Sequence, residues 1–182
     1  MFRRFRNPGP KAMSINPAQL QMLNQANQLV ASGQSAQAAP LFAQLAGVME
    51  TSNHPRRAAN LHAKAAHTYA DGKDEKDALA HARAALGLFI QYQMVQRTSM
   101  FYANITRKLA NQGMKDSAEA LVKEFGPTVG AIPASAPTDQ PHHGSLPTNC
   151  PKCGAALHGG EVNWVDANTA ECDYCGASIR AE

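Results

Sequence analysis

The stretch AAPLFAQL at residues 38–45 has two counterparts further along the chain, ALAHARAA at 78–85 and AEALVKEF at 118–125. The three copies start at a constant interval, at Ala38, Ala78 and Ala118, and the first, fifth and eighth positions of each hold small or apolar side chains. Spacings of four and three place such side chains on one face of an α-helix. The pattern therefore predicts a helical repeat with a 40-residue period.

A glycine precedes each copy, and a second helical pattern precedes each glycine. The glycines are Gly33, Gly72 and Gly113, and the upstream positions are Met22, Ala26 and Leu29, then His62, Ala66 and Tyr69, then Tyr102, Thr106 and Leu109. Glycine favours a turn because it adopts backbone conformations that other residues avoid. The sequence thus predicts three hairpins, each a helix, a short turn and a second helix, over residues 14–126.

Helix start signals accompany this division. They are Asn16-Pro17 and His54-Pro55, which put proline at the first helical position, Asp116 with Glu119 as a capping box, and Thr98 or Ser99 at the start of the fifth helix. Pro40 conflicts with a second helix that begins at Ser35. Because proline removes a backbone hydrogen bond, we expect that helix to begin later or to kink.

Composition narrows the class of protein. The chain has 182 residues, of which 33 are alanine and only 6% are aromatic, which suits closely packed helices better than a β-sandwich. The net charge of +3 is too small to indicate a nucleic-acid-binding protein. No apolar run reaches the roughly 18 residues of a membrane span, and no secretory signal is recognisable. We expect a cytoplasmic protein.

Across residues 16–125 the pattern resembles tetratricopeptide-type repeats, through the glycine turn, the alanine five or six residues later and the apolar residues four and seven beyond that. The unit is longer than the usual repeat of about 34 residues and lacks its closing proline. Relatives with longer helices therefore fit equally, and a plain six-helix bundle is the alternative.

The resemblance implies a groove lined by the first helix of each hairpin. The 40-residue register places Asn27, His67 and Arg107 in one row of this groove and Asn24, Lys64 and Asn104 in a neighbouring row. Amides and cations in a ladder suit an extended peptide or an acidic segment. A solvated helix face is the alternative interpretation.

Two segments outside the helices differ from them in composition. Residues 127–147 contain five prolines and no apolar periodicity, which predicts a flexible linker. Residues 1–13 form a basic arm with Arg3, Arg4, Arg6 and Lys11. Such an arm can contact an anionic membrane or nucleic acid, or remain a solvated tail.

The four cysteines follow the linker as two pairs. Cys150 and Cys153 form one C-x2-C pair, Cys172 and Cys175 form the other, and the segment 154–171 separates the two. This spacing is typical of a structural zinc site with four thiolate ligands. Both pairs continue as Cys-Gly-Ala, where glycine permits a tight turn and backbone N–H groups can point at sulfur.

The segment between the cysteine pairs alternates as strands should. Val162 to Val165 and Thr169 to Glu171 flank an Asp-Ala-Asn turn, and Ile179 can supply a third strand. Residues 148–182 therefore resemble a zinc ribbon. Two disulfides, or an iron centre as in rubredoxin, are the alternatives to one structural Zn²⁺.

The net charge of this segment helps to distinguish a protein partner from a nucleic-acid partner. Residues 146–182 carry a net charge of −3, and a zinc ion held by four thiolates adds about −2. Because an anionic surface repels phosphates, we expect a protein partner rather than nucleic acid. No phosphate-binding loop or hydrolase motif is present.

The sequence as a whole predicts an all-α hairpin-repeat domain joined to a small β zinc ribbon. We expect a non-enzymatic protein–protein interaction adaptor. The alternatives are a nucleic-acid-associated factor that uses the arm and the ribbon, and a rubredoxin-like electron-transfer module.

Overall fold

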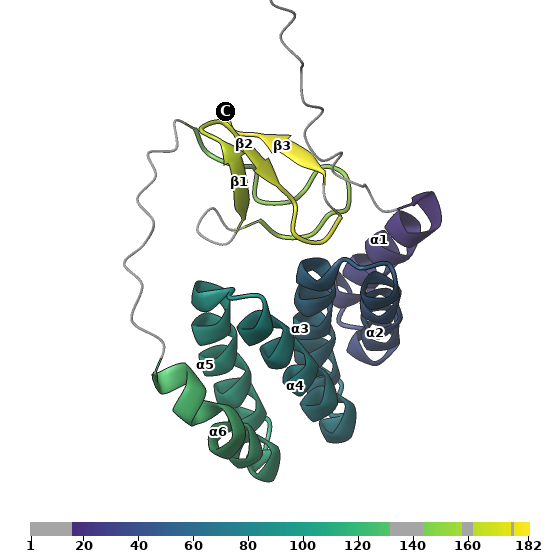
Figure 1. Cartoon of the computed structure of the whole chain (residues 1–182). Helices are drawn as coiled ribbons and strands as arrows, with labels where there is room; N and C mark the ends of the chain where they lie inside the picture. Colours follow the sequence, from purple (N-terminus) through teal and green to yellow (C-terminus); the bar gives the residue numbers. More distant parts are fainter. Residues whose placement is uncertain (1–15, 132–143, 158–161, 176) are drawn as a thin grey trace, which may run out of the picture.

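The computed structural model of the chain describes residues 16–131, 144–157, 162–175 and 177–182, with only the backbone of Asn163 and Val165 (Figure 1). This part is mostly helical, with a small sheet near the C-terminus. The helices are α1 (Pro17–Ala31), α2 (Ser35–Thr51), α3 (Pro55–Asp71), α4 (Glu75–Gln91), α5 (Val95–Asn111) and α6 (Lys115–Gly130). None of these helices is both long and apolar enough to cross a bilayer. The basic arm at residues 1–13 and residues 132–143 of the expected linker lie outside the described residues.

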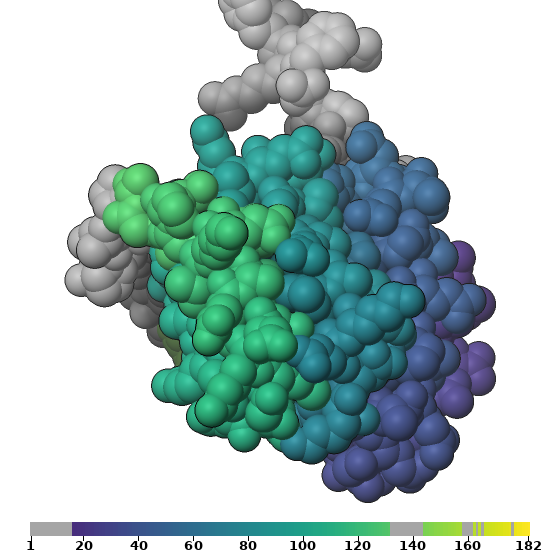
Figure 2. All heavy atoms as spheres, turned by 90° about the horizontal axis from the view of Figure 1, so that it is seen from below, coloured from purple at the N-terminus to yellow at the C-terminus, as the bar shows by residue number. Residues whose placement is uncertain are grey.

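The helices form two layers. Each helix packs against the next one along the chain, while α3 also contacts α5 and α4 also contacts α6. The odd-numbered helices therefore form one layer and the even-numbered helices the other (Figure 1). Seen from below in Figure 2, helical residues form nearly all of the described surface.

All five turns between helices have the same geometry, and they recur at a regular interval along the chain. Gly33, Asn53, Lys73, Gln93 and Gly113 have φ values of 75°, 58°, 64°, 54° and 88°. In each turn the N–H of the following residue donates to the carbonyl five positions before it, as in a Schellman motif. The repeat is therefore marked by backbone conformation more regularly than by glycine.

One expected turn glycine is shifted by one residue. Gly72 caps α3 with an ordinary φ of −77°, and the left-handed residue is its neighbour Lys73. Lys73 lies midway between Gly33 and Gly113 in the 40-residue register, so the register is kept although the glycine is not.

The start of α1 agrees with the sequence prediction, whereas the starts of α5 and α6 differ from it. Asn16 caps α1 with a full capping box, in which its side chain accepts from the Gln19 N–H at 2.9 Å. The prediction that the fifth helix begins at Thr98 or Ser99 was wrong, because α5 begins at Val95. Thr98 lies inside the helix, where its hydroxyl donates to the Met94 carbonyl. The capping box at Asp116 was also wrong, because α6 begins one residue earlier and Asp116 lies in its first turn.

Two prolines lie inside helices. Pro40 is part of α2, which begins at Ser35, so the helix does not begin later to avoid this proline. Pro127 is part of α6, which continues to Gly130 and takes up the first residues of the expected linker. Both prolines are exposed to solvent, where the carbonyls that lose their partners remain hydrated.

Alanine-rich faces form the core between the layers. Ala38, Phe42 and Leu45 of the first repeated stretch are at most 2% exposed, as are their counterparts Ala78, Ala82 and Ala85. The third stretch differs, because Val122 is 51% exposed and Leu121 is buried in its place. The reason is positional, since no described helix follows α6 to cover its second face.

The C-terminal segment is a three-stranded antiparallel sheet with two cysteine loops. Strands β1 (Asn163–Asp166), β2 (Thr169–Glu171) and β3 (Ser178–Arg180) lie in that order, with Trp164 opposite Ala170 and Ala170 opposite Ile179. These are the three strands that the sequence indicated. We call residues 144–182 the ribbon.

The ribbon lies against the layer that contains α1, α3 and α5 (Figure 1). A single cluster of buried residues extends from α1–α3 into the ribbon, where it includes all four cysteines, Leu157 and Ile179. We expected a flexibly tethered ribbon. In the structure it is docked on the helices through a shared apolar core.

Candidate metal centre

The four cysteines come together in the interior of the molecule. Their sulfur atoms all lie within 4.8 Å of one another, and each cysteine is at most 2% exposed. The Cys150–Cys175 and Cys153–Cys172 sulfur pairs are both 3.7 Å apart. A tetrahedral shell with metal–sulfur bonds of about 2.3 Å has sulfur atoms about 3.8 Å apart. The cluster therefore has the size of a tetrathiolate metal site.

The same distances exclude the disulfide alternative in this structure. A disulfide requires sulfur atoms at about 2.05 Å, whereas these pairs lie at 3.7 Å and all four cysteines are free. The donor set is all sulfur and its four positions are filled by protein. Such a closed, soft site suits zinc or iron in a structural or electron-transfer role.

The local sequence forms the loops that present the sulfurs. In the first loop, the Gly154 N–H donates to the Cys150 carbonyl at 2.8 Å, and the Cys150 N–H donates to the Ala155 carbonyl at 2.7 Å. Gly154 has a φ of 70°, which favours glycine at this position. In the second loop the Cys172 N–H donates to the Ala177 carbonyl at 2.9 Å. The two loops are therefore closed by the same backbone hydrogen bond.

Backbone N–H groups point at the sulfurs, as the repeated Cys-Gly-Ala sequence predicted. The Ala155 N–H bonds Cys153, and the Ala177 N–H bonds Cys175. Cys172 accepts from the backbone of Cys175 and Tyr174. Such donors stabilise thiolates and make the sulfurs better metal ligands.

Hydrogen bonds within the cluster shift the pKa values of Cys153 and Cys172 in opposite directions. Hydrogen bonds from Cys153 and Cys175 lower the pKa of Cys172, and donation to Cys172 in turn raises the pKa of Cys153. Four thiolates this close in a buried site require a compensating cation. The residues present therefore fit a divalent metal ion.

The helical domain contacts the two cysteine loops through side chains of α1 and α3. The Asn27 side-chain amide donates to the Cys153 carbonyl at 2.8 Å, and the Lys64 ammonium donates to the Asn27 side-chain oxygen at 2.7 Å. The same ammonium lies 4.8 Å from the centre of the Tyr174 ring and 5.2 Å from that of Phe42. Both cysteine loops therefore face Lys64.

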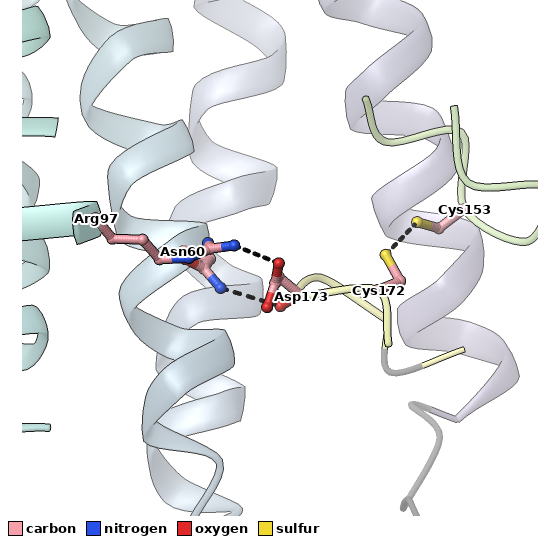
Figure 3. Close-up of polar contacts among 5 residues, drawn as sticks. All are labelled: Asn60, Arg97, Cys153, Cys172 and Asp173. Carbon is pink, nitrogen blue, oxygen red and sulfur yellow. Dashed lines mark hydrogen bonds and ion pairs between the residues drawn. The ribbon is translucent and has the colours of Figure 1, made fainter. Parts of the chain in front are cut away.

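Two arginines of the helical domain bind acidic residues beside the second cysteine pair. Arg57 at the start of α3 forms a 2.8 Å salt bridge with Glu171. Arg97 at the start of α5 pairs with the Asp173 carboxylate and also donates to the Asn60 side-chain oxygen (Figure 3). Asn60 donates to the Asp173 carbonyl at 3.3 Å. Burial raises the pKa of Asp173 to about 6, although Arg97 opposes the shift.

The six residues expected to line a groove separate into three places. Asn27 and Lys64 contact the ribbon. Lys64, His67 and Asn104 line a cavity of about 360 Å³ between the helices and the ribbon, while His67, Asn104 and Arg107 line a neighbouring hollow. Asn24 lies apart from both and faces a hollow that α1 residues alone line. The predicted residues of α3 and α5 therefore lie together and Asn24 does not, while their binding of a partner stays a prediction.

Sequence reasoning missed Arg57, Asn60 and Arg97, although a signal was present. Arg57 and Arg97 lie one repeat period apart and occupy equivalent positions of the repeat. Arg57, Asn60 and Lys64 recur at spacings of three and four, so they share one helix face with the expected ladder. Extending the ladder toward the start of each helix would have found them.

A second cluster of titratable groups lies between α3 and α4. The Nδ1 atoms of His62 and His81 are 2.7 Å apart, and the His62 Nε2 atom is 3.3 Å from a Glu50 carboxylate oxygen. Burial lowers the pKa of both histidines. Because Glu50 meets the opposite ring nitrogen of His62, these groups do not converge on one point as metal ligands do.

His67 provides a test of burial in the cavity. Burial, and to a smaller extent the nearby charge of Lys108, lowers the pKa of His67 to about 4. The His67 ring packs edge-on against the Phe101 ring, with the two ring centres 5.3 Å apart. We expect an NMR titration of the folded protein to place the midpoint of His67 near pH 4, and a midpoint near 6.5 would contradict the structure.

The same shift has a consequence for stability. Between pH 6.5 and about 4 the unfolded chain binds a proton at His67 that the folded chain does not bind. The free energy of unfolding therefore falls as the pH is lowered through this window, by about 3 kcal/mol at most from this residue. Urea unfolding of His67→Gln should show a smaller decrease between pH 7 and pH 4.5 than the unmodified chain.

Comparison with known proteins does not assign this chain to a family. No protein-family model, no curated protein and no solved structure matches the chain.

Proposed function

We propose that this protein is a non-enzymatic adaptor in which a tetratricopeptide-like helical domain and a structural zinc ribbon form one protein-binding surface. The observation that carries the proposal is the cavity of about 360 Å³ that both parts line. The proposal assigns the protein to a reducing compartment such as the cytoplasm, where cysteines without disulfides remain available as metal ligands.

The chemistry of this region favours an extended acidic segment as partner. Phe89, Phe101 and Met100 contribute apolar surface to the cavity. Lys64 and Arg97 contribute positive charge, and the one carboxylate in the lining, Asp71, pairs with Lys108. The adjoining hollow adds Arg107 and Lys108. An extended peptide with an acidic residue beside an aliphatic or aromatic one matches this combination.

Zinc is the metal that the proposal assigns to the four cysteines. All four ligand positions are occupied by cysteine, which leaves no open position for catalysis and suits a structural role. An iron centre in the same ligands would give a red protein, whereas zinc is colourless. The visible spectrum of the purified protein therefore separates the adaptor from an electron-transfer protein.

Peptide selection tests the adaptor function. A random peptide library selected on the zinc-loaded full chain should yield sequences enriched in acidic and apolar residues. Arg107→Glu should weaken the selected peptides at least about tenfold, because a charge is reversed in the groove. The matched control is Arg83→Glu, whose side chain is 45% exposed on α4 and pairs with Glu124. An unenriched library, or equal loss in both variants, would refute the proposed surface.

A further inference from the structure

Lys64 is a lysine of the helical domain that faces the cysteine cluster. Its ammonium donates to Asn27 at 2.7 Å and lies over the ring of Tyr174, a residue that stands between Cys172 and Cys175 in the sequence. Cys153 and Cys172, one from each loop, act on its charge electrostatically. A single cation from α3 therefore interacts with both halves of the cluster.

The charge of Lys64 has no carboxylate partner in the described part of the chain. None of the salt bridges there includes Lys64, and the oxygen that it binds belongs to a neutral amide. Burial lowers the pKa of Lys64, while Cys153 and Cys172 oppose that shift. Even a partly buried ammonium is less favourable when no negative charge lies nearby. Cys153 and Cys172 are the groups whose negative charge acts on Lys64.

A metal-loaded cluster would supply that charge. One divalent ion and four thiolates carry a net charge of −2, and burial of this charge is itself unfavourable without compensation. Asn27 adds a second connection, because its amide donates to the Cys153 carbonyl and thereby fixes the loop that presents this ligand. Lys64 in turn fixes the Asn27 amide.

We propose that Lys64 and Asn27 are outer-shell residues of the metal centre, supplied by the helical domain to the ribbon. Lys64 compensates the charge of the metal and its thiolates, and Asn27 positions the Cys153 loop. Metal affinity is therefore a property of the docked protein and not of the ribbon alone. The inference rests on the metal of the proposed function but not on peptide binding in the groove.

The test is a zinc competition titration of the full chain with a chromogenic chelator. Lys64→Met keeps an apolar stem of similar length and removes the charge, and we expect it to weaken zinc binding about 10- to 100-fold, the usual loss for an outer-shell residue. Lys64→Arg should restore most of the affinity, because it keeps the charge and the adjoining cavity has room for a longer side chain. A role in packing alone would not distinguish methionine from arginine in this way.

Lys108→Met is the matched control, since Lys108 pairs with Asp71 and its loss changes the net charge equally. Wild-type affinity in Lys64→Met, or an equal loss in Lys108→Met, would overturn the inference. If Lys64→Met lowers the helical content, Asn27→Asp decides: it removes the amide donor and neutralises Lys64, and unchanged affinity in that variant would also overturn the inference. Metal content of the unmodified chain is measured first, so that absence of metal is read as failure of the proposed centre itself.

Discussion

Replacing Cys172 by serine is expected to abolish metal binding and to unfold the ribbon while the helices remain folded. A segment of fewer than about 40 residues rarely buries enough surface to fold alone. Metal binding in comparable small sites contributes on the order of 10–16 kcal/mol. The helical domain has a second core cluster without any ribbon residue, so its α3–α6 part does not depend on the metal.

Metal analysis and amide NMR measure this result. We expect one metal ion per unmodified chain and none in Cys172→Ser, together with loss of the dispersed signals of β2 and β3. Ser178→Ala changes an exposed residue of β3 and should keep both metal and dispersion. Equal metal content in Cys172→Ser and the unmodified chain would show that the cluster is not the site.

Reversing the charge of Arg97 is expected to undock the ribbon and, because Lys64 and Asn27 then no longer reach the cluster, to weaken metal binding without abolishing it. Arg97 is 17% exposed and binds both Asp173 and Asn60, so Arg97→Glu places a carboxylate against Asp173 near Glu171. Breaking a buried ion pair costs about 3–5 kcal/mol. The remaining contacts through Arg57 and Asn27 would not offset that loss together with the new repulsion.

The readout is rotational tumbling from ¹⁵N relaxation. The unmodified protein should show one correlation time for the helices and the ribbon, whereas the ribbon of Arg97→Glu should tumble faster. Combining Arg97→Glu with Asp173→Arg should restore a single correlation time, because the pair is re-formed with its charges exchanged. Arg83→Glu serves as the control for charge alone. A single correlation time in Arg97→Glu would mean that the apolar contacts suffice for docking.

The helical repeat and the ribbon were both predictable because each has a local signature. The regular spacing of apolar positions indicated the hairpins, and the Cys-x2-Cys spacing indicated the loops and the strands between them. Turn positions were harder, because Asn53, Lys73 and Gln93 adopt the conformation that glycine favours elsewhere. There the regular packing of helices imposes the turn in spite of residue preference.

Docking of the ribbon was not predictable from the same signals. Its contacts join residues that are distant in the sequence, such as Arg97 with Asp173 and Asn27 with Cys153. A proline-rich segment before the ribbon indicated a tether, and the sequence pattern gave no information on what the tethered part would contact. The charges of the two parts did give a partial indication of docking. The ribbon is acidic, and the helical face that it covers presents Arg57, Lys64 and Arg97.

X-ray absorption at the edge of the bound metal tests the central claim of a tetrathiolate centre most directly. The structure predicts a first shell of four sulfur atoms at about 2.3 Å, with no nitrogen or oxygen ligand. It also predicts that the shell is lost in Cys172→Ser. A shell that contains light-atom ligands, or a purified chain without stoichiometric metal, would contradict the account.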